Sequence, residues 1–343
     1  MWVSMEEFNE MATNWGIASA GLISHDFATA VATLPANEHR LVAVAARDPA
    51  RAKDFAARHN IPHVHSSYEE LAKNADVEVV YVGTINTYHY EVSKLMLEHG
   101  KHVLCEKPLC MNQRDTAALL KLAKEKKLFF MEAIWSRFFP SYEFVRKELS
   151  AKAIGDVVQL NVNFGVYLEA ARVKQMDLGG GTILDLGVYV LQLAVMVFGP
   201  TMPLSLKAVG HLNSEGVDDS AAIVLTYPGS KTAVLTTSSL ANMNKDATIY
   251  GTKGSIQIKD PFWCPTIVVS GDKSSEFVLP PTAQPCNFTN SAGLRYEAAE
   301  VRRCIQEGLY ESPKLTHEET MIISKMEDMV RAQIGVKYPS DPQ

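Results

Sequence analysis

The sequence predicts an α/β domain with a parallel sheet, followed by an α+β domain with a large, mostly antiparallel, open-faced sheet. A chain of 343 residues exceeds what one hydrophobic core usually holds, which favours two domains. Apolar strands alternate with helices in the first part, as in a parallel sheet covered on both faces. After about Pro140, short strands follow one another with little helix between them. We therefore expect domains over residues 1–138 and 139–343.

Each element of the first part follows from a local pattern. The run LVAVAA over residues 41–46 is a buried strand, and Asp48 before Pro49 is a good helix start. Gly100 is a suitable C-cap for the helix that precedes it. The predicted strands are 15–19, 41–46, 77–83, 102–105 and 128–134, and the predicted helices are 27–34, 49–59, 88–99 and 116–125.

The second part contains turn signals between short strands, such as Tyr227-Pro-Gly-Ser and Gly251-Thr-Lys-Gly. The few helices predicted there leave one face of the sheet uncovered, and a homodimer through that face is the natural solution. The predicted strands are 155–166, 205–212, 221–227, 232–239, 247–251 and 255–259, and the predicted helices are 182–198 and 318–334.

Composition narrows the possible partners and the compartment. A net charge of −6 offers no basic surface for nucleic acid or an anionic membrane. Residues 1–14 carry three glutamates and no long apolar stretch, so they predict a polar lead-in and no secretory signal. The apolar run 188–198 is interrupted by Gln192 and is too short to span a bilayer. Five cysteines without CxxC spacing indicate reduced thiols in a cytoplasmic protein, and the lack of HExxH predicts no metal.

The turn after the first strand, Ser19-Ala-Gly21-Leu-Ile-Ser24, resembles the dinucleotide-binding turn of a Rossmann fold. That turn normally reads GxGxxG; here serine replaces the first and third glycines, and Gly21 remains where the backbone approaches the pyrophosphate. A plain tight turn is the alternative, but a strand before and a helix after favour the dinucleotide. The expected contacts from this turn are Ser19, Gly21, Leu22 and Ile23.

The second strand ends in Ala45-Ala46-Arg47, where a carboxylate would be needed to hold a ribose 2′-hydroxyl. Arg47 and Arg51 lie beside a helix N-terminus, whose dipole disfavours cations. A bound 2′-phosphate would relieve this conflict through charge-assisted pairs, whereas two solvated surface arginines are the alternative. The missing carboxylate favours NADP(H) as the cofactor.

Two further motifs carry chemistry. Cys105-Glu106-Lys107-Pro108 closes the predicted strand 102–105, at the edge where open α/β sheets place their ligands; a solvated Glu106–Lys107 pair is the alternative. A triple glycine at 179–181 leads into a helix on which Asp185 and Tyr189 share one face. An Asp–Tyr hydrogen bond that stabilises packing is the alternative there, and a buried carboxylate needs partners, of which Lys107 is a candidate.

The combination of EKP after a strand, GGG…DxG and a polar aromatic residue resembles the glucose-fructose oxidoreductase/inositol dehydrogenase/MocA family of two-domain dehydrogenases. The resemblance covers nearly the whole chain. It is closer to one branch, the dimeric dihydrodiol dehydrogenases, which also act as D-xylose 1-dehydrogenases. The shared stretches include VAVAARD, SYEELA, VLCEKP, MVFG, GVDD, GTKG, WCPT and PCNF.

The resemblance implies that Lys107 and Tyr189 form the catalytic pair, with Tyr189 as general acid/base and Lys107 lowering its pKa and orienting the substrate oxygen. Hydride removal from a carbon that bears a hydroxyl also requires removal of the hydroxyl proton. A free tyrosine with a pKa near 10 is a poor base, which an adjacent ammonium would correct. Asp185 would hold the substrate or the lysine. Many relatives carry histidine in place of Tyr189.

The resemblance also implies contacts around the nicotinamide. Asn86-Thr-Tyr-His89 matches the family's Asn-x-x-His segment, although Asn86 also suits a helix N-cap and His89 a surface position. The implied cofactor contacts there are Thr84, Asn86, Glu106 and Lys107. The implied substrate contacts are His89 and an aromatic wall of Trp135, Phe164 and Phe288, for which core packing is the alternative.

These observations predict an NADP-dependent dehydrogenase of cyclic vicinal diols, either trans-dihydrodiols or pyranose sugars such as D-xylose. The alternatives are a reductase of another sugar or dicarbonyl substrate, and a non-catalytic NADP-sensing regulator. The presence of Lys107, Asp185 and Tyr189 together argues against a regulator, which needs none of them. Residues 167–178 depart from the branch pattern, so the exact substrate stays open.

Overall fold

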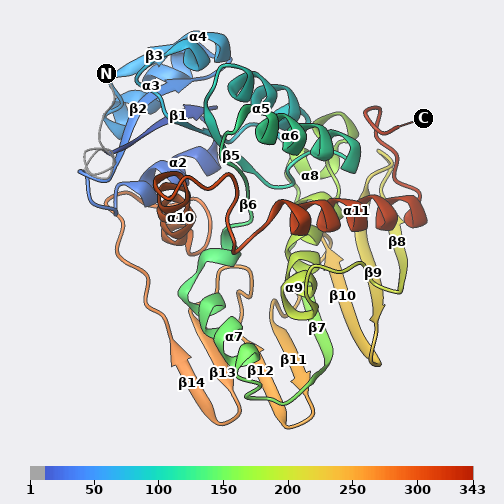
Figure 1. The fold of residues 1–343 in the computed structure, drawn as a ribbon. Coiled ribbons are helices and arrows are strands. Elements are labelled where there is room, and N and C mark those ends of the chain that lie inside the picture. Colours follow the sequence, from blue (N-terminus) through green and yellow to red (C-terminus); the bar gives the residue numbers. More distant parts are fainter. Residues whose placement is uncertain (1–11, 343) are drawn as a thin grey trace.

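The first half of the chain forms a parallel sheet of six strands in the order β3-β2-β1-β4-β5-β6 (Figure 1). The computed structural model describes residues 12–342. All neighbouring strands in this sheet run parallel, and the order reverses between β1 and β4, where such sheets bind ligands. The strands are β1 (Thr13–Ala18), β2 (His39–Ala45), β3 (His63–His65), β4 (Val79–Val82), β5 (His102–Glu106) and β6 (Phe130–Ala133).

Helices cover both faces of this sheet. They are α2 (Leu22–Val31), α3 (Pro49–His59), α4 (Tyr68–Lys73), η1 (Asn86–Tyr88), α5 (His89–Glu98) and α6 (Gln113–Lys126). Side chains alternate along each strand: on β4, Val79 and Tyr81 enter the core that contains Phe27 of α2, whereas Val80 and Val82 enter the core beneath α5 and α6. The parallel, doubly covered sheet predicted from the sequence is therefore confirmed.

The second half forms a sheet of eight strands in the order β14-β13-β12-β11-β7-β10-β9-β8. Only β7 and β10 run parallel; the other neighbours are antiparallel, as predicted. The strands are β7 (Val157–Gly165), β8 (Ser205–Leu212), β9 (Asp218–Tyr227), β10 (Lys231–Ser238), β11 (Ala247–Gly251), β12 (Gly254–Ile258), β13 (Ile267–Ser270) and β14 (Lys273–Glu276).

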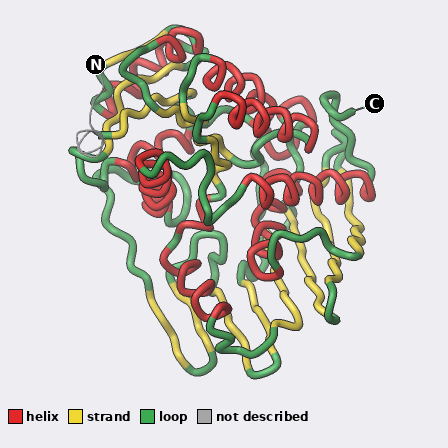
Figure 2. The backbone as a smooth tube through the Cα atoms, in the orientation of Figure 1, coloured by secondary structure: helices red, strands yellow, loops and turns green. Residues whose placement is uncertain are grey.

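The longer helices of the second half lie on one face of this sheet, toward the parallel domain (Figures 1 and 2). The elements are η2 (Trp135–Phe138), α7 (Pro140–Ser150), α8 (Ala171–Lys174), η3 (Met176–Leu178), the π-helical turn η4 (Ile183–Gly187), α9 (Val188–Phe198), η5 (Ser291–Gly293), α10 (Leu294–Gln306) and α11 (His317–Ile334). The α10 helix packs against α2, and α11 packs against α6. C-terminal segments thus complete the first domain.

The boundary after residue 138 remains a proposal; it coincides with the end of η2, where the chain leaves the parallel sheet. The segment before α10 also returns to the first domain. The Asp26 carboxylate of α2 accepts hydrogen bonds from the backbone N–H groups of Asn287 and Phe288 and from the Ser291 hydroxyl, at 2.6 to 3.0 Å. This fully buried carboxylate ties the two halves together beside the dinucleotide turn.

Sequence patterns located most elements within a few residues but made specific errors. The helix predicted over 27–34 begins at Leu22, directly after Gly21. Its early polar residues Ser24, His25 and Asp26 are buried, and Asp26 binds the returning segment 287–291. Helix α5 lacks a side-chain N-cap, so Asn86 does not cap it, whereas Asp48 caps α3 as predicted. The strands and α-helices that were missed are β3, α4, α7, α8, α10, β13 and β14.

Three expectations from composition concern the N-terminal lead-in, the cysteines and the apolar helix. The predicted lead-in over 1–14 lies outside the described residues except for its last three. All five cysteines are free. The helical stretch Met176–Phe198 has the length and apolar composition to cross a membrane, yet 83 % of its most apolar window is buried inside the protein, as in a core helix.

Candidate active site

The turn between β1 and α2 offers backbone N–H groups to an anion. Helix α2 has no side-chain cap and no acidic residue in its first turn, and an uncapped helix N-terminus favours phosphate groups. Ser19 adopts φ +99°, a conformation that favours glycine. A Cβ on Gly83, at the end of β4, would lie 2.3 Å from Ser24 Oγ. The close approach that a third glycine normally permits is therefore provided by Gly83.

The two predicted phosphate-binding arginines border this turn. Arg51 donates a hydrogen bond from Nη2 to the Ala20 carbonyl at 3.2 Å, and the Arg47 guanidinium lies 4.7 Å from the centroid of the Tyr88 ring. Arg47 is exposed, and neither arginine forms a salt bridge with a carboxylate in the part of the chain that the structure describes. Both keep donors available at the carboxyl edge of β2.

Lys107 follows β5 at the same edge and connects the two halves of the chain. Its Nζ donates to the Asp185 carbonyl at 2.8 Å and to Asp185 Oδ1 at 3.2 Å. Arg172, which sequence reasoning missed, donates from Nη1 to the same Oδ1 at 2.7 Å. Burial alone would raise the pKa of Asp185, but the two cations outweigh it and hold this pKa well below its usual range.

The side chains of Asp218 and Tyr338 hold the glycine-rich loop that leads to Asp185. Asp218, the first aspartate of the GVDD stretch, accepts hydrogen bonds from Ile183 N at 2.8 Å and from Thr182 Oγ1 at 2.6 Å. The Tyr338 hydroxyl donates to the Gly180 carbonyl. Gly181 adopts φ +114°, and a Cβ there would lie 2.5 Å from Asp218 Oδ1. Glycine is therefore required where the loop passes over the Asp218 carboxylate.

Tyr189 lies on the next turn of the helix and does not hydrogen-bond Asp185. Its hydroxyl oxygen accepts a hydrogen bond from Trp135 Nε1 at 2.7 Å. Because an indole N–H can only donate, the tyrosine proton must point away from Trp135. Lys107 Nζ lies 5.0 Å from the centroid of the Tyr189 ring, so the cation faces the ring rather than donating to the hydroxyl.

The structure contradicts the expectation that Lys107 lowers the pKa of Tyr189. Burial raises this pKa well above 10, and the nearby carboxylates of Glu106 and Asp185 raise it further, while the Trp135 hydrogen bond opposes them. The reason is that the ammonium of Lys107 is paired with Asp185. Tyr189 therefore holds its proton at neutral pH and is suited to donate it.

An aromatic wall surrounds Tyr189, although not with all the predicted members. Phe164 meets the Tyr189 ring edge-to-face at 5.8 Å and stacks on Trp263 at 4.2 Å. Trp135 joins through its indole. Phe288 forms no ring contact with them among the described residues; its backbone N–H binds Asp26 on α2, and it is 40 % exposed. Trp263, part of the WCPT stretch, was missed because nothing in its local sequence separates a wall residue from a core residue.

The segment 86–89, predicted to lie near the nicotinamide, contacts main-chain carbonyls of the neighbouring loops. His89 is 1 % exposed, and its two ring nitrogens contact the Pro108 and Thr84 carbonyls at 2.7 and 3.0 Å. Burial lowers the pKa of His89, and the neutral ring has one N–H to donate to these carbonyls. Asn86 Nδ2 donates to the Gly179 carbonyl at 3.0 Å, joining the β4 edge to the glycine loop. The Thr84 hydroxyl is buried without a partner among the described residues.

Buried carboxyl groups lie behind Lys107. Glu106 accepts hydrogen bonds from the Tyr81 hydroxyl at 2.6 Å and from Lys107 N at 3.2 Å, and burial raises its pKa. Glu132 accepts from Leu109 N at 2.9 Å. Burial raises the pKa of Glu132 from its usual 4.5 to about 7, against its hydrogen bonds from Leu109 and Thr320.

The fold and this edge define a two-domain oxidoreductase with a nicotinamide-binding Rossmann domain. The profile described as "Oxidoreductase family, NAD-binding Rossmann fold" matches residues 13–134, and the GFO/IDH/MocA C-terminal domain matches residues 142–257. The chain belongs to the Gfo/Idh/MocA oxidoreductase family, as the motifs predicted.

Individual relatives agree with this assignment. The trans-1,2-dihydrobenzene-1,2-diol dehydrogenase of Xenopus tropicalis is 46 % identical over 330 residues, covering 96 % of this chain and 100 % of the relative. The human protein of that name is 43 % identical over 332 residues, covering 96 % of this chain and 99 % of the relative.

Solved structures share the same two-domain fold. A levoglucosan dehydrogenase with NADH and levoglucosan is 19 % identical, with a TM-score of 0.82 over 95 % of this chain and 98 % of that one. KijD10, a 3-ketoreductase from Actinomadura kijaniata in complex with NADP and TDP-benzene, is 25 % identical, with a TM-score of 0.78 over 94 % of this chain and 98 % of that one.

The raised pKa of Glu132 predicts a pH-dependent stability. Because the folded state holds this proton more tightly than the unfolded chain, its contribution is full below pH 4.5 and is lost as the pH rises through about 7. The Glu132→Gln variant, which retains the acceptor for Leu109, should remove up to about 3 kcal/mol of that pH dependence. Urea unfolding at pH 5 and pH 8 measures it, with the exposed Glu98→Gln as control. An unchanged pH dependence in Glu132→Gln would contradict the prediction.

Proposed function

We propose that this protein is a cytoplasmic, NADP-dependent dehydrogenase that transfers a hydride between nicotinamide and a cyclic vicinal diol. The diol is a trans-dihydrodiol or a pyranose sugar such as D-xylose. The observation that carries the proposal is the convergence of Lys107, Asp185 and Tyr189 at the carboxyl edge of the parallel sheet. The names of the relatives support the diol class.

Bound nicotinamide would accept or supply the hydride, and the chain's own residues handle the proton and the substrate oxygens. In reduction, protonated Tyr189, oriented by Trp135, donates its proton to the substrate oxygen. Oxidation is the reverse step: Tyr189 must first lose its proton, and the tyrosinate then accepts the proton of the substrate hydroxyl. The Lys107 ammonium stabilises negative charge that develops on that oxygen. Asp185 uses Oδ1 for its two cations, so Oδ2 is available to accept a hydrogen bond from the neighbouring substrate hydroxyl.

The residues at the β1–α2 turn fit a dinucleotide, and the arginines favour the phosphorylated form. The uncapped α2 N-terminus suits the pyrophosphate. Arg47 and Arg51 stand where a ribose carboxylate partner would otherwise lie, and a guanidinium pairs with phosphate in a bidentate manner. Thr84, with its unpartnered hydroxyl, is a further candidate contact.

A homodimer through the open face of the second sheet is part of the proposal. Exposed apolar side chains lie on four strands of this sheet: Val209 on β8, Val224 on β9, Val234 on β10 and Tyr250 on β11. Strand β7 lies between β10 and β11 and places Asn161 beside Val234. Val224 and Val234 lie directly opposite each other in the register. A second copy would remove these apolar side chains from water.

The activity is tested by mixing pure protein with NADP+ and a panel of dihydrodiols and pyranoses, D-xylose included, and following the absorbance of reduced nicotinamide. We expect reduction with at least one cyclic diol. Lys107→Met should abolish turnover while nucleotide binding, followed by fluorescence, stays near wild type, because Lys107 contacts Asp185 and not the α2 turn. No reduction with any substrate would favour the regulatory alternative, and near-normal kcat in Lys107→Met would remove Lys107 from the mechanism.

Replacing Arg47 tests the cofactor preference. Arg47→Ala should raise KM for NADP+ by roughly tenfold or more, because one charge-assisted phosphate contact contributes about 1.5–3 kcal/mol. KM for NAD+ should change little. Steady-state kinetics with both nucleotides give the comparison, and Arg58→Ala, on an exposed part of α3, is the control. Equal effects on the two nucleotides would show that Arg47 does not recognise the 2′-phosphate.

The dimer is tested by light scattering at micromolar concentration, where we expect twice the mass of the chain. Val234→Glu should yield monomers, since it places a charge among the exposed apolar side chains of this face. Val278→Glu, at an 80 % exposed position outside the strands, should leave the dimer intact. A monomeric wild-type mass, or an unaffected dimer in Val234→Glu, would contradict this interface.

A further inference from the structure

The turn η2 lies between the two sheets and touches the tyrosine helix at more than one point. It begins at Trp135, whose indole N–H binds the Tyr189 hydroxyl. Two residues later Arg137, 1 % exposed, points into the protein. The turn directly follows β6, the last strand of the parallel sheet.

Arg137 directs its donors to the helix that carries Tyr189. Nε donates to Gln192 Oε1 at 2.6 Å, and Nη2 donates to the Gln192 carbonyl at 3.1 Å. A planar guanidinium that binds one residue at both its side chain and its backbone fixes that residue in position and orientation. Arg137 therefore holds α9 one turn after Tyr189.

Gln192 passes this constraint to Tyr189. Its Nε2 donates to the Tyr189 carbonyl at 3.1 Å and to the Tyr142 hydroxyl at 3.2 Å. The side chain is fully buried in an otherwise apolar helix. An amide at such a position costs desolvation unless all its groups are hydrogen-bonded, and here both the oxygen and the nitrogen are.

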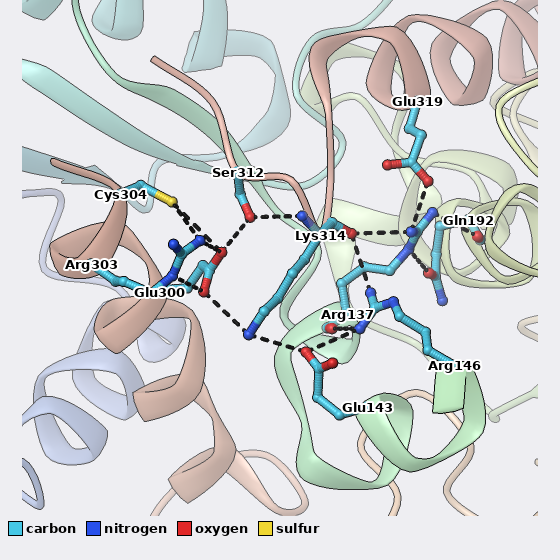
Figure 3. A network of polar contacts seen from close by, with 10 residues as sticks. All are labelled: Arg137, Glu143, Arg146, Gln192, Glu300, Arg303, Cys304, Ser312, Lys314 and Glu319. Carbon is cyan, nitrogen blue, oxygen red and sulfur yellow. Dashed lines mark hydrogen bonds and ion pairs between the residues drawn. The ribbon is translucent and has the colours of Figure 1, made fainter. Parts of the chain in front are cut away.

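The charge of Arg137 is balanced by a carboxylate of helix α11. Nη1 donates to Glu319 Oε1 at 2.9 Å and to the Lys314 carbonyl at 3.2 Å. Figure 3 shows that the network continues from Lys314 to Glu143 and Glu300, away from Gln192. One half of the network therefore faces the tyrosine helix, and the other half joins α10 to α7.

We propose that η2 holds Tyr189 at two points, the hydroxyl through Trp135 and the main chain through Arg137 and Gln192. Arg137 and Gln192 are then positioning residues for proton transfer; this inference rests on the proposed role of Tyr189. Trp135 fixes the direction of the hydroxyl proton, and the Arg137–Gln192 pair fixes the distance of the hydroxyl from Trp135. Proton transfer depends steeply on such distances.

Gln192→Glu keeps the hydrogen bond between residue 192 and Arg137 but removes the one to the Tyr189 carbonyl. The carboxylate still accepts from Arg137 Nε, but it can no longer donate to the Tyr189 carbonyl. We expect kcat to fall about tenfold, with KM for the dinucleotide changed less than about twofold. In a Tyr189→Phe background the same substitution should have no further effect, because its effect acts through the tyrosine hydroxyl.

Glu300→Gln is the matched control. Glu300 is buried in the same network but contacts Arg303, Ser312 and Lys314 instead of Gln192, so kcat should stay near wild type even if Tm falls. Equal losses of kcat in Gln192→Glu and Glu300→Gln, or an equal loss in the Tyr189→Phe background, would reduce Arg137 and Gln192 to a structural role. If Tyr189→Phe itself is fully active, the proposed role of Tyr189 fails instead.

A readout independent of turnover completes the test. The indole N–H resonance of Trp135, assigned by its loss in Trp135→Phe, reports the hydrogen bond to Tyr189. It should shift in Gln192→Glu and stay in place in Glu300→Gln. If this resonance does not shift in Gln192→Glu, the inference is wrong, regardless of the kcat that the variant shows.

Discussion

The Asp185 carboxylate and its two cations are the interaction on which the rest of the site depends. Lys107 comes from the end of the parallel sheet and Arg172 from the segment before the glycine loop, and both bind the same oxygen. A carboxylate as buried as this one is stable only when paired, and removing either cation would leave an uncompensated charge. The pairing therefore fixes where the second half of the chain meets the first. It also explains why Lys107 does not depress the pKa of Tyr189, since its charge is already engaged.

The surroundings of this triad combine charge with apolar walls. Glu106 and Glu132 lie behind Lys107, and burial raises the pKa of each. Phe164 packs edge-to-face on the Tyr189 ring and stacks on Trp263, and Tyr189 is buried. A proton held by a buried phenol, beside a fixed ammonium and a fixed carboxylate, is the arrangement that acid/base chemistry on a hydroxyl requires.

The sequence alone indicated residues whose motifs lie at strand ends or in glycine-rich loops. Lys107 and Asp185 were predicted to be partners because a buried carboxylate needs a cation, and they are. Arg172 was missed because it lies 13 residues from Asp185 in a segment without recognisable pattern. Arg137 and Gln192 were missed for a related reason: their pairing joins residues 55 positions apart, and only the packing of η2 on α9 reveals it. Helix α10 was overlooked because three of its charged side chains, Glu297, Glu300 and Arg302, are buried, and charged residues usually indicate an exposed surface.

The dinucleotide turn shows why its glycine motif was a weak signal while the fold was not. Ser19 adopts the positive φ that the first glycine normally allows, at a cost of about 1–3 kcal/mol that the surrounding sheet must sustain. The close packing that the third glycine allows is achieved from the opposite side, because Gly83 leaves room for the Ser24 side chain. The turn requires a particular backbone path and a short distance between helix and strand. Residues on either β4 or α2 can satisfy this requirement. A motif written along one segment cannot represent a condition shared between β4 and α2. The alternation of strands and helices, which reflects burial on both faces of the sheet, is therefore the more reliable predictor of this domain than its glycines.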